Sequence, residues 1–141
     1  MNRYKTTLKV LMIAAAMALT LALNGLAQGT PAGAHVPAPG SAERKAITDG
    51  LRGDQKVVFK IHYLRVHGDW AWIDVTPMDA KGTAVAEGGT SLMHKEGGAR
   101  KTMDLSGLPD DPDNPMQEPT PKFVKQLQRK FPGLPADIFP H

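Results

Sequence analysis

Three side chains on one predicted strand are the first candidates for chemistry. Side chains alternate between the two faces of a strand, so Trp70, Trp72 and Asp74 are expected to share one face. Enclosure of that face would raise the pKa of Asp74, and the more basic carboxylate could then act as a general base. The indoles would either line a ligand pocket or form core beneath a helix. Burying an indole is an efficient way to build a small core, so a core role is favoured, and all three residues remain candidate ligand-binding residues.

Other chemistry has less support in the sequence. The proline-rich acidic loop over residues 106–119 offers oxygen ligands for calcium, but it lacks the ligand order of an EF-hand, which favours a solvated loop. His62, His67 and His94 do not have the spacing of a local metal-ligand pair, so each is interpreted as a sheet-surface or turn residue. The chain has no cysteine, which excludes thiolate zinc sites and thiol catalysis. We therefore predict no catalytic residue, no metal site and no cofactor.

The first 27 residues have the build of a secretory signal peptide. Three basic residues precede an apolar run over residues 10–23, and the small residues Gly25 and Ala27 follow. A membrane-spanning helix needs about 20 apolar residues, more than this run has. We predict cleavage after Ala27, a periplasmic or secreted location, and no stable membrane span after cleavage. An uncleaved membrane anchor is the alternative.

Charge limits the class of partner. The whole chain has 17 Lys+Arg and 14 Asp+Glu, a formal charge of +3. Residues 1–27 contain three basic residues and no acidic one, so removing them leaves 14 of each sign. A nucleic-acid-binding protein needs clustered basic surface to displace counterions from phosphates. The neutral remainder argues against nucleic acid and leaves an unidentified protein or small ligand as the partner.

The rest of the chain divides into a tether and one domain. Residues 28–40 are rich in proline and glycine and predict a flexible tether in which His35 is solvated. Residues 41–141 predict a single domain that starts with a short helix over 41–52, capped by Ser41. β-Branched and aromatic runs then predict four strands joined by short turns, an antiparallel meander. These strands are expected over residues 55–66, 70–76, 84–96 and 99–105.

Local signals refine the strands. The apolar parity changes near Tyr63 and Leu64, which indicates a bulge or bend. Pro77 is expected to end the second strand because it lacks an N–H, and Gly88 and Gly89 indicate a bulge or a close backbone approach.

A last helix is predicted to begin at Pro121, with Thr120 as its cap. It is too short to be stable alone, so it should dock on the sheet face that the first helix leaves uncovered, on the end of the sheet, or on another subunit. Its basic face is interpreted as solvated. Its apolar stripe consists of Phe123, Val124, Leu127 and Phe131.

Three segments carry a resemblance to a known group: the run SAERKAITDGLR, the run VVFKIHYLRVHGDWAWIDVTP and the run SLMHKEGGARKTMDLSG. They resemble small exported bacterial proteins of unassigned function. The resemblance implies a cystatin-like or nuclear-transport-factor-like arrangement, in which a curved sheet wraps a helix, and it transfers no active site.

These observations predict an α+β fold with an N-terminal helix, a four-stranded antiparallel meander and a C-terminal helix. The leading functional hypothesis is an exported, non-enzymatic module that binds a protein or a small ligand. The alternative is a small enzyme or ligand-pocket protein with Asp74 and a histidine inside the concave face of the sheet. A helix that fills this face would favour the first hypothesis, and a cavity with converging polar groups would favour the second.

Overall fold

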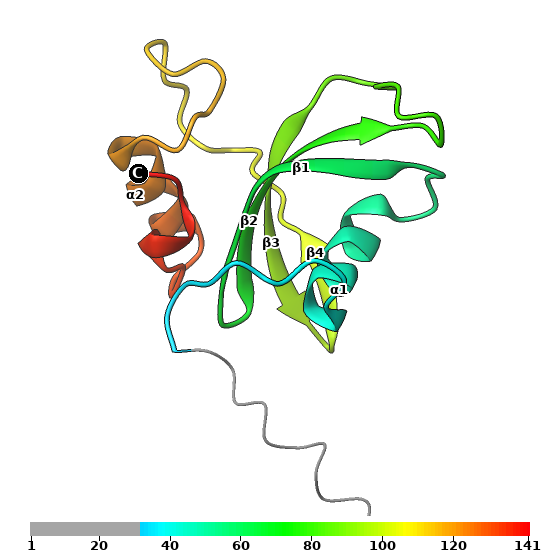
Figure 1. Cartoon of the computed structure of the whole chain (residues 1–141). Helices are drawn as coiled ribbons and strands as arrows, with labels where there is room; N and C mark the ends of the chain where they lie inside the picture. Colours follow the sequence, from blue (N-terminus) through cyan, green and yellow to red (C-terminus); the bar gives the residue numbers. More distant parts are fainter. Residues whose placement is uncertain (1–31) are drawn as a thin grey trace, which may run out of the picture. The chain divides into compact units, whose positions relative to one another are not determined.

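The computed structural model describes residues 32–141, so the predicted signal peptide lies outside the described residues. The described chain combines helices with a four-stranded antiparallel sheet (Figure 1), which confirms the α+β class. Its elements, in chain order, are α1 (Ala42–Arg52), β1 (Val58–His67), β2 (Trp70–Met78), β3 (Gly89–Glu96), β4 (Ala99–Thr102), α2 (Pro121–Lys130) and the 3-10 helix η1 (Ala136–Ile138).

The sheet is the predicted meander. Its strand order is β1-β2-β3-β4, and each strand pairs antiparallel with the next. Gly97 and Gly98 form the predicted two-residue hairpin turn, with φ values of 56° and 83°. Both lie in the left-handed region that such a turn requires and that glycine adopts without strain.

The third strand begins later than predicted, at Gly89, and Gly88 before it lies close to the backbone of β2. A Cβ atom on Gly88 would lie 2.7 Å from Thr76 Oγ1 and 2.8 Å from the Val75 carbonyl oxygen. The expected close backbone approach is therefore confirmed at this glycine. Upstream of it, Ala84 makes only an isolated bridge to Met78, so regular pairing starts after Gly88.

The prediction that Pro77 ends the second strand is wrong. β2 continues to Met78, and Pro77 lies opposite Phe59 of β1. The N–H and C=O of one strand residue point to the same side. The Pro77 carbonyl accepts a hydrogen bond from the Val85 N–H at 3.0 Å, on the side away from β1. The missing N–H therefore removes no bond from the β1–β2 ladder.

The bulge in β1 lies at His62, slightly before the predicted position. The register with β2 shifts between Ile61 and Tyr63, which leaves His62 as the extra residue. The shift brings Phe59 and Ile61 onto the same face as Leu64, where all three pack in one cluster. Extra residues of this kind bend a strand, and the sheet curves around α1 (Figure 1).

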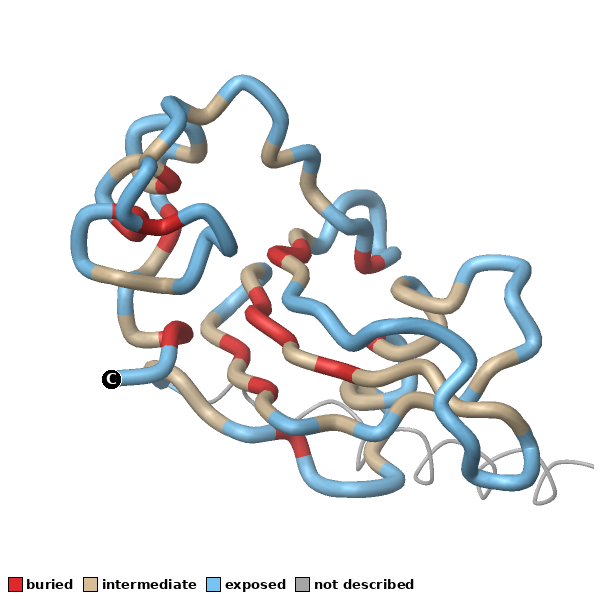
Figure 2. The backbone as a smooth tube through the Cα atoms, turned by 90° about the horizontal axis from the view of Figure 1, so that it is seen from above, coloured by how far each residue is buried: buried red, intermediate tan, exposed pale blue. Residues whose placement is uncertain are grey.

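Two hydrophobic clusters, one on each face of the sheet, pack the helices against the strands. The buried positions lie mainly in the strands, α2 and the tail (Figure 2). Side chains alternate along β2 as predicted, so neighbouring residues enter different clusters. The cluster beneath α1 contains Ile47, Leu64, Val66, Ala71, Ile73, Val75 and Met93. The cluster beneath α2 contains Trp72, Leu92, Phe123, Val124, Leu127, Leu134, Ile138 and Phe139.

The first helix rests on the backbone of β4. Ser41 caps it by accepting a hydrogen bond from the Arg44 N–H at 3.2 Å. A Cβ atom on Gly50 would lie 2.3 Å from the carbonyl oxygen of Arg100. Glycine weakens a helix interior, but here its missing side chain permits the close contact between α1 and β4.

The second helix starts as predicted. The Thr120 side chain accepts a hydrogen bond from the Phe123 N–H at 3.2 Å, and Pro121 is the first helical residue. Of the three predicted hosts, the helix docks on the sheet face that α1 leaves uncovered. No helix among residues 32–141 is long and apolar enough to cross a membrane.

The description of residues 28–40 as a flexible tether does not hold for His35 and Pro37. The backbone of His35 forms two hydrogen bonds with Val66 of β1, at 2.8 and 2.9 Å. Pro37 is buried, and its carbonyl accepts a hydrogen bond from Arg44. An edge strand offers unpaired backbone groups, and this segment satisfies part of them, a pairing that its proline-rich composition does not indicate.

Candidate functional site

Trp72 lies in the core. It is 1 % exposed, and its ring centroid lies 4.9 Å from that of Phe139. Trp72 therefore belongs to the interior beneath α2, as the sequence favoured, and it is not a surface platform.

Trp70 is two residues before Trp72 on β2, so it shares the same face of the sheet, and it is half-buried. Its ring centroid is 4.2 Å from that of His94, which is directly opposite on β3, and 5.9 Å from that of Phe131 at the end of α2. These contacts pack the C-terminal end of α2 against the sheet. They also give His94 a packing role that its sequence position did not indicate.

Asp74 does not face the concave side of the sheet. It shares the face of Trp72, opposite Tyr63 on β1 and Thr90 on β3, and it is half-buried. The concave side is filled by α1, whose Ile47 is fully buried. The arrangement required for the enzyme alternative, with Asp74 inside a concave pocket, is therefore absent from the described chain.

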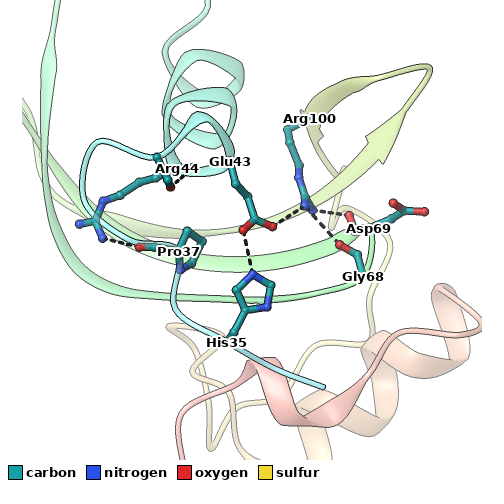
Figure 3. A network of polar contacts seen from close by, with 8 residues as sticks. His35, Pro37, Glu43, Arg44, Gly68, Asp69 and Arg100 are labelled. Carbon is teal, nitrogen blue, oxygen red and sulfur yellow. Dashed lines mark hydrogen bonds and ion pairs between the residues drawn. The ribbon is translucent and has the colours of Figure 1, made fainter. Parts of the chain in front are cut away.

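A buried polar network ties α1 to the sheet (Figure 3). Arg100 donates hydrogen bonds to the carbonyl oxygens of Asp69 at 2.5 Å and Gly68 at 3.2 Å, in the turn between β1 and β2. Its guanidinium also lies 3.6 Å from the Glu43 carboxylate of α1. The other oxygen of Glu43 is 2.8 Å from Nε2 of His35.

This network is structural. The Arg100 side chain is 6 % exposed, and burial lowers its pKa while the Glu43 charge opposes that change. Its bonds go to backbone carbonyls and to Glu43, which are groups of the chain itself. Sequence reasoning missed it because its members come from four separate segments. Buried arginine is uncommon unless it is paired in this way.

A second set of contacts holds the C-terminal tail, defined as residues 134–141, against β1. Tyr63 Oη donates to the carbonyl oxygen of Ile138 at 3.0 Å, and Arg65 donates to that of Asp137 at 3.3 Å. His67 Nδ1 lies 2.8 Å from the Asp137 carboxylate. After the bulge, Tyr63, Arg65 and His67 alternate onto the face that α2 covers. That alternation was the available sequence signal, but the partner is about 70 residues away.

The Asp137 carboxylate is stabilised by this arrangement. Desolvation acts to raise its pKa, but the hydrogen bond and charge of His67 and the N–H of Ala34 bring the pKa below its ordinary value. The N-terminal segment and β1 therefore both contact the tail at Asp137.

The tail and α2 form the walls of an open groove of about 420 Å³, here named the α2–tail groove. Its polar side chains are Lys125, Gln128 and His141. Gln128 is held by a 2.9 Å hydrogen bond to the Leu134 carbonyl, which fixes the tail across the helix. The apolar walls consist of Pro119, Pro121, Val124, Ala136, Phe139 and Pro140.

The acidic loop before α2 is closed by its own contacts. Asp111 lies 2.9 Å from Lys122, and this hydrogen bond lowers the pKa of Asp111 and raises that of Lys122. The Asn114 side chain bridges the N–H and C=O of Glu118 at 2.8 Å each. Within residues 32–141, no group of three or more His, Asp or Glu side chains is arranged to hold a metal ion.

Comparison with known proteins gave no match to a family model, to a curated protein or to a solved structure. The fold is therefore described by its own architecture, an α+β arrangement in which a four-stranded antiparallel sheet has a helix on each face.

Proposed function

We propose that the protein is an exported, non-enzymatic binding module for a small amphipathic anion, a molecule with an apolar body and one negative group. The observation that carries the proposal is the α2–tail groove. Its volume of about 420 Å³ is in the range of small-molecule sites, which are typically apolar clefts with a few polar groups. Three of its wall residues are prolines, and their fixed φ angles favour a preformed shape.

The charge around the groove favours an anion. Lys125 lies at the groove, and the α2 helix carries four cations and no acidic residue. No acidic side chain lines the groove. A ligand with its apolar part against the exposed wall residues Pro121, Ala136 and Pro140 would place its charged group near the Lys125 ammonium. Such a placement would gain both apolar burial and a charge-assisted contact.

Packing on the other face supports a role other than catalysis. The concave face that the enzyme alternative requires is filled by α1. Asp74 does not line the α2–tail groove. Export is inferred from the predicted signal peptide of residues 1–27.

The experiment is a fluorescence titration with two probes. The first is 8-anilinonaphthalene-1-sulfonate, which has an apolar body and one sulfonate, and the second is the uncharged N-phenyl-1-naphthylamine. Ala136→Phe should fill the groove from its exposed rim and abolish saturable binding of both probes. Lys125→Gln should weaken binding of the sulfonate about fivefold to tenfold and leave the neutral probe unaffected, because it removes only a charge-assisted contact.

Ala46→Phe is the matched control, since Ala46 is an exposed residue of α1, remote from the groove in the sequence and absent from its walls. It adds the same apolar surface without filling the groove. Equal loss of binding in Ala46→Phe and Ala136→Phe would contradict the proposal, as would full binding in Ala136→Phe.

A further inference from the structure

A second cavity lies on another side of α2. It has a volume of about 420 Å³ and is formed by the C-terminal half of α2 and the loop of residues 106–109, and we name it the α2–loop pocket. The side chains that α2 contributes to it are Gln126, Arg129 and Lys130. It shares no lining residue with the α2–tail groove.

The two cations of this pocket, Arg129 and Lys130, differ from each other in their contacts with the rest of the chain. The Lys130 ammonium donates to the Ser106 carbonyl and lies 5.7 Å from the ring centroid of Phe131, so it is held at the wall from two directions. Arg129 is exposed and has no ion pair with any residue of the described chain. Lys130 is therefore a cation held in place, and Arg129 beside it keeps its five N–H donors available for a ligand.

The loop contributes backbone rather than charge. The lining residues from the loop are Ser106, Gly107, Leu108 and Pro109, none of which is acidic. Asp104, beside the loop, accepts a hydrogen bond from the Ser106 N–H at 2.8 Å and interacts with the Lys130 charge. Asp104 acts on Lys130, whereas Arg129 has no ion pair within the described chain.

We propose that the α2–loop pocket binds a phosphate monoester group. The planar guanidinium of Arg129 can present two parallel N–H groups to two phosphate oxygens, while Lys130 adds a fixed charge and Gln126 an amide donor. The negative end of the α2 dipole opposes an anion here, which limits the affinity and favours a doubly charged group over a singly charged one. This inference concerns a different site from the proposed function and does not depend on it.

The test is a titration of ¹⁵N-labelled protein with glycerol 3-phosphate at constant ionic strength, followed by the amide shifts of Gly107 and Leu108. Saturable shifts are expected. Arg129→Gln should weaken the binding about tenfold, as expected for loss of a bidentate charge-assisted contact. Lys60→Gln, at an exposed position of β1, is the control for loss of one positive charge elsewhere.

Vesicles distinguish the source of the phosphate. Co-sedimentation with vesicles containing phosphatidic acid but not with pure phosphatidylcholine vesicles, lost in Arg129→Gln, would assign the group to a lipid headgroup. Saturable binding of glycerol 3-phosphate without co-sedimentation would assign it to a free phosphate ester. Either result supports the shared chemistry.

Two results would overturn the proposal: shifts of Gly107 and Leu108 that do not saturate, or equal weakening by Arg129→Gln and Lys60→Gln. The same variants separate this site from the groove. Arg129→Gln should leave the neutral naphthylamine probe bound as in the parent, so failure at one site is not failure at the other.

Discussion

The two sides of the sheet differ in how closely their helices pack against the rest of the chain. On the α1 side, the helix backbone at Gly50 lies against the carbonyl of Arg100, and Ile47 is fully buried. On the α2 side, the centre is equally closed by Trp72, but the flanks of the helix border cavities. Both sides of the sheet therefore contribute to the core, whereas cavities that a ligand could enter border the flanks of α2.

The two helices also differ in how their charges are paired. In α1, Asp49 lies in ion pairs with Lys45 and Arg52, and Glu43 interacts with the buried Arg100. In α2, the four cations have no acidic residue on their own helix. An unbalanced helix attracts an external anion more readily than one with internal pairs. Variants in the buried core and variants on the flanks of α2 should therefore separate stability from binding.

The largest effect is expected for Trp72→Ala. Truncation of a buried aromatic residue removes apolar burial and leaves a cavity, so the free energy of unfolding should fall by about 3–5 kcal/mol. Urea denaturation measures this change. Trp70→Ala is the matched control and should cost clearly less, because Trp70 is only half-buried. Unchanged stability in Trp72→Ala would show that the α2 side does not contribute to the core.

Arg100→Met should have the next largest effect. It removes the guanidinium donor from the Gly68 and Asp69 carbonyls, of which Asp69 keeps the Lys95 N–H, and it removes the guanidinium partner of Glu43. The free energy of unfolding should fall by about 2–4 kcal/mol. Lys101→Met, at the exposed neighbouring position, is expected to have little effect. In the folded variant, binding of the naphthylamine probe should remain. If probe binding is lost while the fold persists, the two sides are not independent.

Gly50→Ala tests the contact between α1 and β4. Alanine is favoured over glycine in a helix by about 1 kcal/mol, but the new Cβ would lie 2.3 Å from the Arg100 carbonyl oxygen. Overpacking of this kind should prevail and lower the stability by about 1–3 kcal/mol. A rise in the midpoint of thermal unfolding would contradict this expectation. Ala46→Gly, at an exposed position of α1, should show the propensity effect alone.

Asp137→Asn should have the smallest effect, because the pair with His67 is partly exposed and such pairs contribute about 1 kcal/mol or less. The pKa of Asp137 in the folded protein lies below its ordinary value of 3.8. A carboxyl with a lowered pKa stabilises the fold above its unfolded pKa, and the contribution is lost as the pH falls through the folded pKa. The stabilities of the parent and Asp137→Asn should therefore differ at neutral pH and converge once the pH has fallen through the lowered pKa of Asp137.

Urea denaturation at neutral pH and at a pH below the pKa of Asp137 measures this convergence. Asp110→Asn is the control, since Asp110 is an exposed residue of the acidic loop. A difference between the parent and Asp137→Asn that grows as the pH falls would contradict the assigned sign.

The sequence by itself determined the elements and their faces. Alternation along residues 70–76 separated Trp72 from Ile73, and the structure places them in different clusters. Thr120 and Pro121 marked the start of α2, and the glycine pair 97–98 marked the last hairpin. These features depend on local periodicity and on backbone preferences, which neighbouring residues specify without help from the rest of the chain.

Only the tertiary structure decided which surfaces are closed and which remain open. The partner of His67 is Asp137 in the tail, and the partners of Arg100 lie in α1 and in the turn before β2. The two cavities beside α2 likewise combine its side chains with separate segments on its two flanks. Local sequence cannot specify such contacts, because they depend on the curvature set by one extra residue at His62 and on where the tail docks. Pairing between distant segments is therefore the reason that the predicted site residues on β2 and the cavities beside α2 do not coincide.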